Sequence, residues 1–173
     1  MITTSIIEDN SKINQISPVR DLYFKIIFLV WADSSIRAES LSKHLGSHLY
    51  LINFKFKNKI CFPIKYLILF AKTYHILRKE RPEIIICQIP SIFCALSSMM
   101  CSYLLGLNIN IVVDAHTGAF CEPWSHFKIL NKIVIKRASI TIVTNTELQK
   151  DISSDYGVQA VVLEDALPDL VSD

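Results

Sequence analysis

Apolar runs of strand length alternate with longer segments of helical pattern along most of the chain. Runs with few polar positions are typical of strands buried on both faces of a parallel sheet, and apolar residues three or four positions apart are typical of helices. We therefore expect strands at 25–31, 48–54, 83–89, 108–115, 139–144 and 159–167. The same pattern predicts helices at 35–46, 63–80, 91–107, 123–138 and 146–156.

Strict alternation of strands and helices predicts an α/β fold with a doubly wound, parallel, Rossmann-like sheet. We expect the strand order 3-2-1-4-5-6, in which ligands bind outside the carboxyl ends of the strands. A chain of 173 residues fits one domain, which we place at 23–168. The pattern predicts a loosely ordered extension at 1–22 and the start of an interdomain linker at 169–173.

Composition narrows the class of protein. With 51% hydrophobic and 20% charged residues, the chain is typical of a packed domain and not of a disordered segment. The net charge of +2 is too small to indicate nucleic-acid binding, so we expect no nucleic-acid partner. Five cysteines at spacings of neither a zinc site nor a disulfide framework favour a reducing cytosol. We find no signal-peptide pattern and no apolar run of membrane-spanning length.

The turn after the first predicted strand argues against the commonest nucleotide-binding folds. WADSSIRAES (31–40) contains no glycine, whereas both the dinucleotide-binding motif and the P-loop need several. A single acid there, Asp33, is weak support for a phosphoacceptor domain. Elsewhere no Ser-His-Asp or Cys-His arrangement can be argued, so nucleophilic hydrolysis has little support.

The stretch KILNKIVIKRASITIVTNTELQKDISSDYGV (128–158) joins a basic helix, an apolar strand and a polar helix start. Together with SIRAESLSKHLG (35–46) and VLEDALPDL (162–170), it resembles the N-terminal domain of family 4-like glycosyltransferases, which have the GT-B architecture. The resemblance covers roughly residues 25–170. It implies the acceptor-side half of a hexosyltransferase that moves a sugar from a nucleotide-sugar donor to a glycan or lipid-linked acceptor, as in polysaccharide biosynthesis.

The resemblance also implies a second domain, which binds the donor and carries an acidic motif of two glutamates. The sequence stops at Asp173, where that domain should begin, and the glycine-rich turn used against the donor diphosphate is absent. We therefore expect the isolated chain to be inactive, either as a truncated product or as one subunit of a split enzyme with a separate donor-binding subunit. The first alternative is a non-catalytic module that binds a catalytic partner or recruits it to a membrane. A weaker one is an unrelated α/β enzyme, such as a hydrolase or a methyltransferase.

Candidate site residues lie where the predicted strands end. In IVVDAHTGAF (111–120), His116 follows the fourth strand. A histidine in this loop lies near the reacting sugar in the resembling family, which makes His116 the candidate catalytic residue; its imidazole can donate to a hydroxyl or phosphate oxygen. The candidate substrate-binding residues are Ser34, Ser35, Asp114, Thr117, Gly118, Asn145 and Glu147.

Each of these residues also has an ordinary structural interpretation. Asp114 can cap the next turn, and His116 can be a loop residue with a local hydrogen bond. Asn145 and Glu147 suit a normal helix start. Nothing resembles a metal–diphosphate site, so we expect no metal and no cofactor, with the nucleotide-sugar acting as donor substrate.

The predicted helix 63–80 carries a basic stripe. Residues expected to pack on the sheet are Tyr66, Leu67, Phe70, Tyr74 and Leu77. The opposite side presents Lys65, Lys72 and Lys79, with Ile68, Leu69 and Ile76 among them. Lysines beside exposed aliphatic residues suit an anionic membrane surface, so we expect a cytoplasmic protein that is peripheral on the inner face of the plasma membrane. The alternative is a solvated face whose aliphatic residues are covered by the N-terminal extension.

Overall fold

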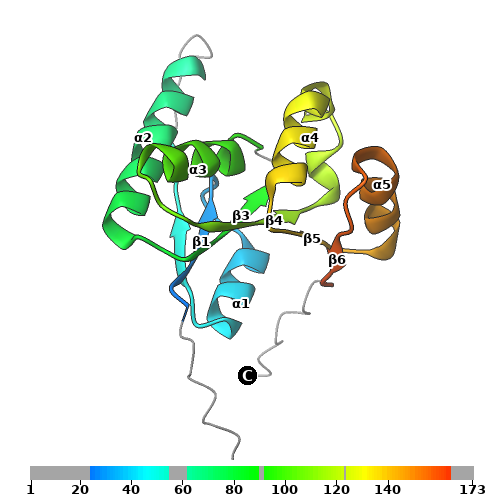
Figure 1. Cartoon of the computed structure of the whole chain (residues 1–173), viewed down its shortest axis with the longest axis horizontal. Helices are drawn as coiled ribbons and strands as arrows, with labels where there is room; N and C mark the ends of the chain where they lie inside the picture. The colour runs from blue at the N-terminus through cyan, green and yellow to red at the C-terminus, as the bar shows by residue number, and fades with distance from the viewer. Residues whose placement is uncertain (1–23, 55–61, 90–91, 123, 165–173) are drawn as a thin grey trace, which may run out of the picture.

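The computed structural model describes residues 24–54, 62–89, 92–122 and 124–164, which form an α/β domain around an all-parallel, six-stranded sheet (Figure 1). The strands are β1 (Ile26–Val30), β2 (His48–Leu51), β3 (Ile84–Ile89), β4 (Asn110–Ala115), β5 (Ile140–Val143) and β6 (Val161–Val162). The helices are α1 (Ile36–His44), α2 (Phe62–Glu80), α3 (Ile92–Leu104), α4 (Lys128–Arg137) and α5 (Thr146–Tyr156), with two short 3-10 helices, η3 (Thr117–Ala119) and η4 (Trp124–Phe127). The predicted fold class is confirmed. The expected extension at 1–22 and linker at 169–173 lie outside the described residues.

The strand order is β2-β1-β3-β4-β5-β6, so the expected order 3-2-1-4-5-6 is wrong. Strand burial gives the physical reason. In β3 five of the six residues are buried, whereas β2 has no fully buried residue. A strand that is apolar on both faces belongs in the centre of a parallel sheet, and a half-exposed strand belongs at its edge. β1 therefore pairs with both, and Ile27 lies opposite His48 on one side and Ile85 on the other.

This order distributes the helices unequally over the sheet. The step from β1 to β2 runs in one direction, and every later step runs in the other. Because crossovers between parallel strands are right-handed, the reversal places α1 on one face and α2 to α5 on the opposite face, as Figure 1 shows. The direction changes between β1 and β3, which is the switch point where doubly wound sheets bind ligands.

Alternation along the strands produces two cores. The larger lies beneath α2 to α5 and contains, among its strand residues, Ile27, Leu29, Ile85, Cys87, Ile89, Ile111, Val113, Ala115 and Val143. The smaller lies beneath α1 and contains Phe28, Val30, Ala38, Ile86 and Val112. Positions 88 and 114 continue the alternation of the smaller core, so polar side chains at those positions also face α1.

The start and the end of α1 lie where the sequence predicts them. Ser35 caps the helix, because its hydroxyl oxygen accepts a hydrogen bond from the Ala38 backbone N–H at 3.2 Å. Gly46, the predicted stop, has φ of +59°, a left-handed conformation that glycine adopts at little cost. Capping thus places the first turn of α1 against the carboxyl ends of β3 and β4.

Candidate functional site

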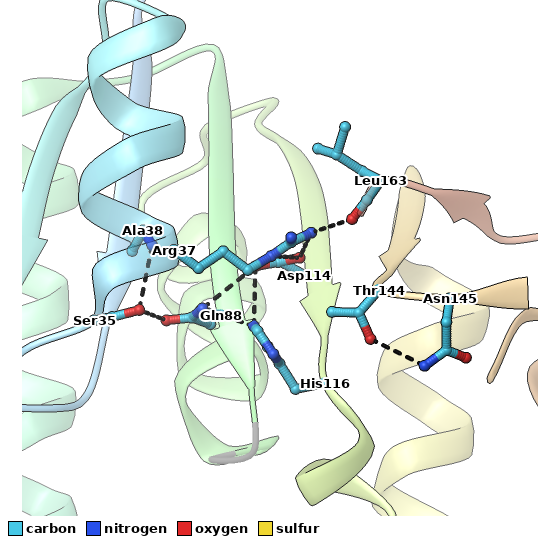
Figure 2. Close-up of polar contacts among 9 residues, drawn as sticks. All are labelled: Ser35, Arg37, Ala38, Gln88, Asp114, His116, Thr144, Asn145 and Leu163. Atoms are coloured by element: carbon cyan, nitrogen blue, oxygen red, sulfur yellow. Dashed lines mark hydrogen bonds and ion pairs between the residues drawn. The ribbon is translucent and has the colours of Figure 1, made fainter. Parts of the chain in front are cut away.

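An arginine and an aspartate from distant parts of the chain form a buried ion pair beneath α1 (Figure 2). Arg37 lies in the first turn of α1, and Asp114 lies near the end of β4. Nε of Arg37 donates to the two carboxylate oxygens at 3.1 and 3.0 Å, and Nη2 donates to Oδ1 at 3.0 Å. Nη2 also donates to the backbone carbonyl of Leu163 at 2.8 Å. The pair therefore ties α1 and β4 to the segment that follows β6.

The charge of Asp114 is stabilised inside the protein. Burial alone raises the pKa of its carboxyl, but a hydrogen bond and positive charge from His116 when its ring is protonated, together with those of Arg37, outweigh burial and hold the pKa below its usual value. The side chains of Arg37 and Asp114 are 7% and 0% exposed. Asp114 is therefore an internal carboxylate that orients its neighbours and does not itself face solvent.

Gln88 connects this pair to the start of α1. It lies on β3 directly opposite Asp114 in the parallel register and is buried. Its Oε1 accepts a hydrogen bond from the Ser35 hydroxyl at 2.5 Å, and its Nε2 donates to Oδ2 of Asp114 at 3.4 Å. These two partners fix the amide orientation, so that the NH₂ group faces β4 and the oxygen faces α1.

His116 completes the network at the sheet edge. Its Nε2 lies 2.8 Å from Nε2 of Gln88, and because the Gln88 nitrogen carries hydrogens, the neutral ring accepts there and holds its own proton on Nδ1. When the ring is protonated, Nε2–H faces Oδ2 of Asp114 at 3.5 Å. The ring thus has a partner in both protonation states. Its side chain is 27% exposed, and no partner for Nδ1 is found among the described residues.

The network lies at the point where the fold favours ligand binding. Ser35 follows β1, Gln88 lies near the end of β3, and His116 follows β4. The three side chains meet at the carboxyl edge beside the β1–β3 switch point. The expected grouping of the loops after β1, β4 and β5 on one edge is confirmed, because all six strands are parallel.

The remaining predicted site residues lie outside the network. Thr117 and Gly118 are exposed in η3, directly after His116, and a Cβ at Gly118 would meet no atom within 4 Å. Ser34 is exposed in the turn before α1. These residues form the rim of the site, and none of the hydrogen bonds within the described residues draws them into it.

Asn145 and Glu147 have the ordinary structural role of residues at the start of a helix. Oδ1 of Asn145 accepts from the Leu148 backbone N–H at 2.8 Å and so caps α5. Glu147 is exposed in the first turn, where an acid interacts favourably with the helix dipole. Figure 2 shows Asn145 beside Thr144 and apart from the His116 network. Asp114, in contrast, does not cap the next turn, because it belongs to β4 and pairs with Arg37.

Sequence reasoning missed two members of the network. Gln88 left a signal, since it is the only uncharged polar side chain in the otherwise apolar run EIIICQI (83–89) and stands near its carboxyl end. Arg37 left none, because an arginine on a short amphipathic helix is usually solvated. Its burial depends on a carboxylate 77 positions further along the chain.

The basic stripe on α2 is partly as predicted. Lys72 and Lys79 are exposed, whereas Lys65 is half-buried. Nζ of Lys72 lies 3.4 Å from the Asn53 carbonyl oxygen and 5.6 Å from the centre of the Phe54 ring. Membrane-spanning helices are not found in the part of the chain that the structure describes.

The expected exposure of the aliphatic residues beside the lysines is wrong for Leu69 and Ile76, and Ile68 is half-buried. Leu69 is 2% exposed and Ile76 packs against the larger core, whereas Leu67, expected to face the sheet, is 67% exposed. The buried stripe runs through Leu69, Thr73 and Leu77, because the buried Thr73 hydroxyl accepts a hydrogen bond from Nε1 of Trp31 at 3.2 Å. Phe70, Tyr74 and Leu77 pack against the core as expected, so the buried face differs from the predicted one mainly at Leu67.

No protein-family model matches the sequence, and no curated protein matches it. The resemblance to family 4-like glycosyltransferases therefore stays a prediction from the residues. Within the described residues, no three His, Cys, Asp or Glu side chains lie close enough together to hold a metal ion. The His116 network lies at the carboxyl edge of the sheet, the edge at which doubly wound folds bind ligands.

Proposed function

We propose that this chain is the acceptor-side half of a glycosyltransferase, which moves a sugar from a nucleotide-sugar donor to a glycan or lipid-linked acceptor. The observation that carries the proposal is the setting of His116. Its ring is held by Gln88 and Asp114 at the carboxyl edge of a doubly wound sheet, with Nδ1 left for a ligand. A positioned donor of this kind is what a sugar hydroxyl or a phosphate oxygen requires.

The proposed chemistry divides the work between two parts. Transfer breaks the bond between the sugar and the donor diphosphate and joins the sugar to an acceptor hydroxyl oxygen, whose proton passes to the departing diphosphate. In this proposal Nδ1–H of His116 donates to the sugar or a phosphate oxygen, and Asp114 stabilises the ring when Nε2 is protonated. Neutralising the leaving diphosphate falls to a separate donor-binding domain or subunit.

The acceptor is proposed to bind over the exposed rim next to His116. Thr117 offers a hydroxyl there, and the open space around Gly118 lets a ligand approach the backbone closely. Ser34 lies on the same edge, after β1. These exposed polar groups are suited to the hydroxyls of a glycan.

A non-catalytic binding module is the second candidate. It is favoured by the hydrogen bonds that Arg37, Asp114 and Gln88 make with one another. A network closed in this way has a sufficient structural role, which is to hold α1 on the sheet. In that case a partner protein would bind the rim, and the protonation of His116 would not matter.

A glycan-binding assay distinguishes the two candidates. On an array of free and lipid-linked oligosaccharides, the glycosyltransferase proposal predicts binding that His116→Ala weakens by about tenfold, the loss of one good hydrogen bond to the ligand. The matched control is His75→Ala, which removes an exposed histidine from α2 and should change nothing. Glycan binding that is indifferent to His116, or no glycan binding at all, would count against the proposal.

Activity of the isolated chain is a second test. Because the proposal assigns donor binding elsewhere, the purified chain should not hydrolyse or transfer from any nucleotide-sugar. Turnover clearly above background would show that the donor site lies within this chain and would overturn the division of work.

A further inference from the structure

α4 and α5 lie on the face of the sheet opposite to α1 (Figure 1). A second polar site is lined by residues of these two helices. A pocket of about 190 Å³ is present there. We propose that this pocket binds a small organic cation through its ammonium group. The lining residues on which the proposal depends are Phe120, Lys128, Asn131, Asp151, Asp155 and Tyr156.

Asn131 supplies the first observation. Its side chain lines the pocket and is 1% exposed, yet its Oδ1 has no hydrogen-bond partner among the described residues. Buried polar atoms are nearly always paired, so an orphaned acceptor indicates a missing donor. A ligand that donates hydrogen bonds within this pocket supplies that donor.

The two aspartates of the pocket indicate that the missing hydrogen-bond donor carries a positive charge. Asp151 and Asp155 lie one turn apart on α5 and line the same pocket. Like charges at this spacing destabilise a helix, and acids near its carboxyl end oppose the dipole. Asp155 accepts a hydrogen bond from the neighbouring Ser154 hydroxyl at 3.4 Å, but neither carboxylate has an ion-pair partner within the described part of the chain.

The charge of Asp155 also acts on the neighbouring aromatic residue. Burial and the charge of Asp155 together raise the pKa of the Tyr156 hydroxyl. Two exposed acids one turn apart, with Asp155 also in the last turn against the dipole, are mutually unfavourable for an empty helix. They become favourable when a cation occupies the pocket.

Two aromatic rings favour an ammonium group over a bare metal ion. Phe120 and Tyr156 line the pocket with their ring centres 6.1 Å apart. Aromatic faces attract ammonium groups and contribute apolar surface to the carbon atoms beside them. The volume of about 190 Å³ is below the ~300 Å³ at which drug-sized sites begin, so the ligand is a small molecule.

Lys128 is the internal competitor for this site. It lines the pocket from the start of α4, but no ion pair joins it to either carboxylate within the described residues. The proposal therefore requires that an external ammonium binds while Lys128 remains in place. Removing the lysine charge with Lys128→Gln should strengthen binding moderately.

A titration of the full chain, followed by NMR of its backbone and side-chain amides at constant ionic strength, tests the proposal. Ethanolamine is the probe, and ethylene glycol is its neutral match. We expect saturable shifts at α4, α5 and the Asn131 amide with ethanolamine only. Asp151→Asn and Asp155→Asn should each weaken binding by about fivefold, and the exposed control Glu39→Gln should leave it unchanged.

Four results would overturn the proposal. They are no binding of ethanolamine by either the wild type or Lys128→Gln, equal shifts with ethylene glycol, binding of Mg²⁺ in place of ethanolamine, and binding of ethanolamine only after Lys128→Gln. The last would identify Lys128 itself as the group that fills the pocket. None of these outcomes depends on the role of His116, so this test is independent of the proposed glycosyltransferase function.

Discussion

Replacing Arg37 with methionine should destabilise the fold far more than the loss of a surface arginine would. The change leaves the fully buried Asp114 carboxylate without the guanidinium that donates to both of its oxygens. It also leaves the Leu163 carbonyl without its donor at 2.8 Å. Breaking a buried ion pair by removing one partner costs about 3–5 kcal/mol, and we expect a loss in this range.

The double variant Arg37→Met with Asp114→Leu should recover most of that loss. Replacing both partners by apolar residues removes the uncompensated charge, and such replacements are often neutral or stabilising. The two single changes should therefore be strongly non-additive, as expected for side chains in direct contact.

Urea unfolding of the chain, followed by circular dichroism, measures these effects. The matched control is Arg78→Met on the exposed side of α2, which should stay within about 0.5 kcal/mol of the wild type. If Arg37→Met stays within about 1 kcal/mol of the wild type, the value of a solvated ion pair, Asp114 does not depend on the guanidinium for its stability. Additive losses in the double variant would likewise show that the two side chains are not coupled.

Three further predictions follow from particular contacts. Because the folded-state pKa of Asp114 is lowered, its contribution to stability is fully present above its unfolded pKa of about 3.9 and is lost as the pH falls through the lower folded value; acid unfolding curves should show this dependence, and Arg37→Met should reduce it. Asn145→Ala removes the cap of α5 and should cost about 1 kcal/mol in urea unfolding, while a change near zero would argue against the cap. Since Leu69 and Ile76, two of the aliphatic residues expected beside the lysines of α2, are covered, any co-sedimentation with anionic vesicles should rest on exposed lysines, at about 1 kcal/mol each, and should disappear at high salt and in Lys72→Glu with Lys79→Glu; binding that survives high salt would contradict this.

The elements of the fold could be predicted from the sequence because each carries a local signal. Apolar runs such as KIIFLVW and EIIICQI indicate buried strands, and Ser35 and Gly46 mark the ends of α1. The strand order could not be predicted in this way, because it depends on which strand competes best for the centre of the sheet. β2 and β3 both look apolar in the sequence and both pair with β1, and only the second pairing of β3, with β4, distinguishes the centre of the sheet from its edge.

The candidate site could be predicted only in part. His116 and Ser35 were indicated by their places after strands, and both belong to the network. The negative charge of Asp114 in this network is balanced by Arg37, which lies 77 positions away in the sequence. No local sequence pattern indicates such a long-range pair. The exposed side of α2 was misjudged too. The polar residue Thr73 is buried there and accepts a hydrogen bond from Trp31, which is distant in the sequence.

The protonation of the His116 ring nitrogens decides whether this site presents a hydrogen-bond donor to a ligand. Long-range ¹⁵N–¹H correlation of the histidine rings, assigned with His116→Ala, reports which ring nitrogen carries the proton. We expect a neutral ring protonated on Nδ1, with Nε2 accepting from Gln88, a bias that Gln88→Leu should remove. A glycan that binds the chain should then shift the Nδ1 resonance. A neutral ring protonated on Nε2, or a ring that does not respond to a bound glycan, would contradict the claim that this site presents His116 to a ligand.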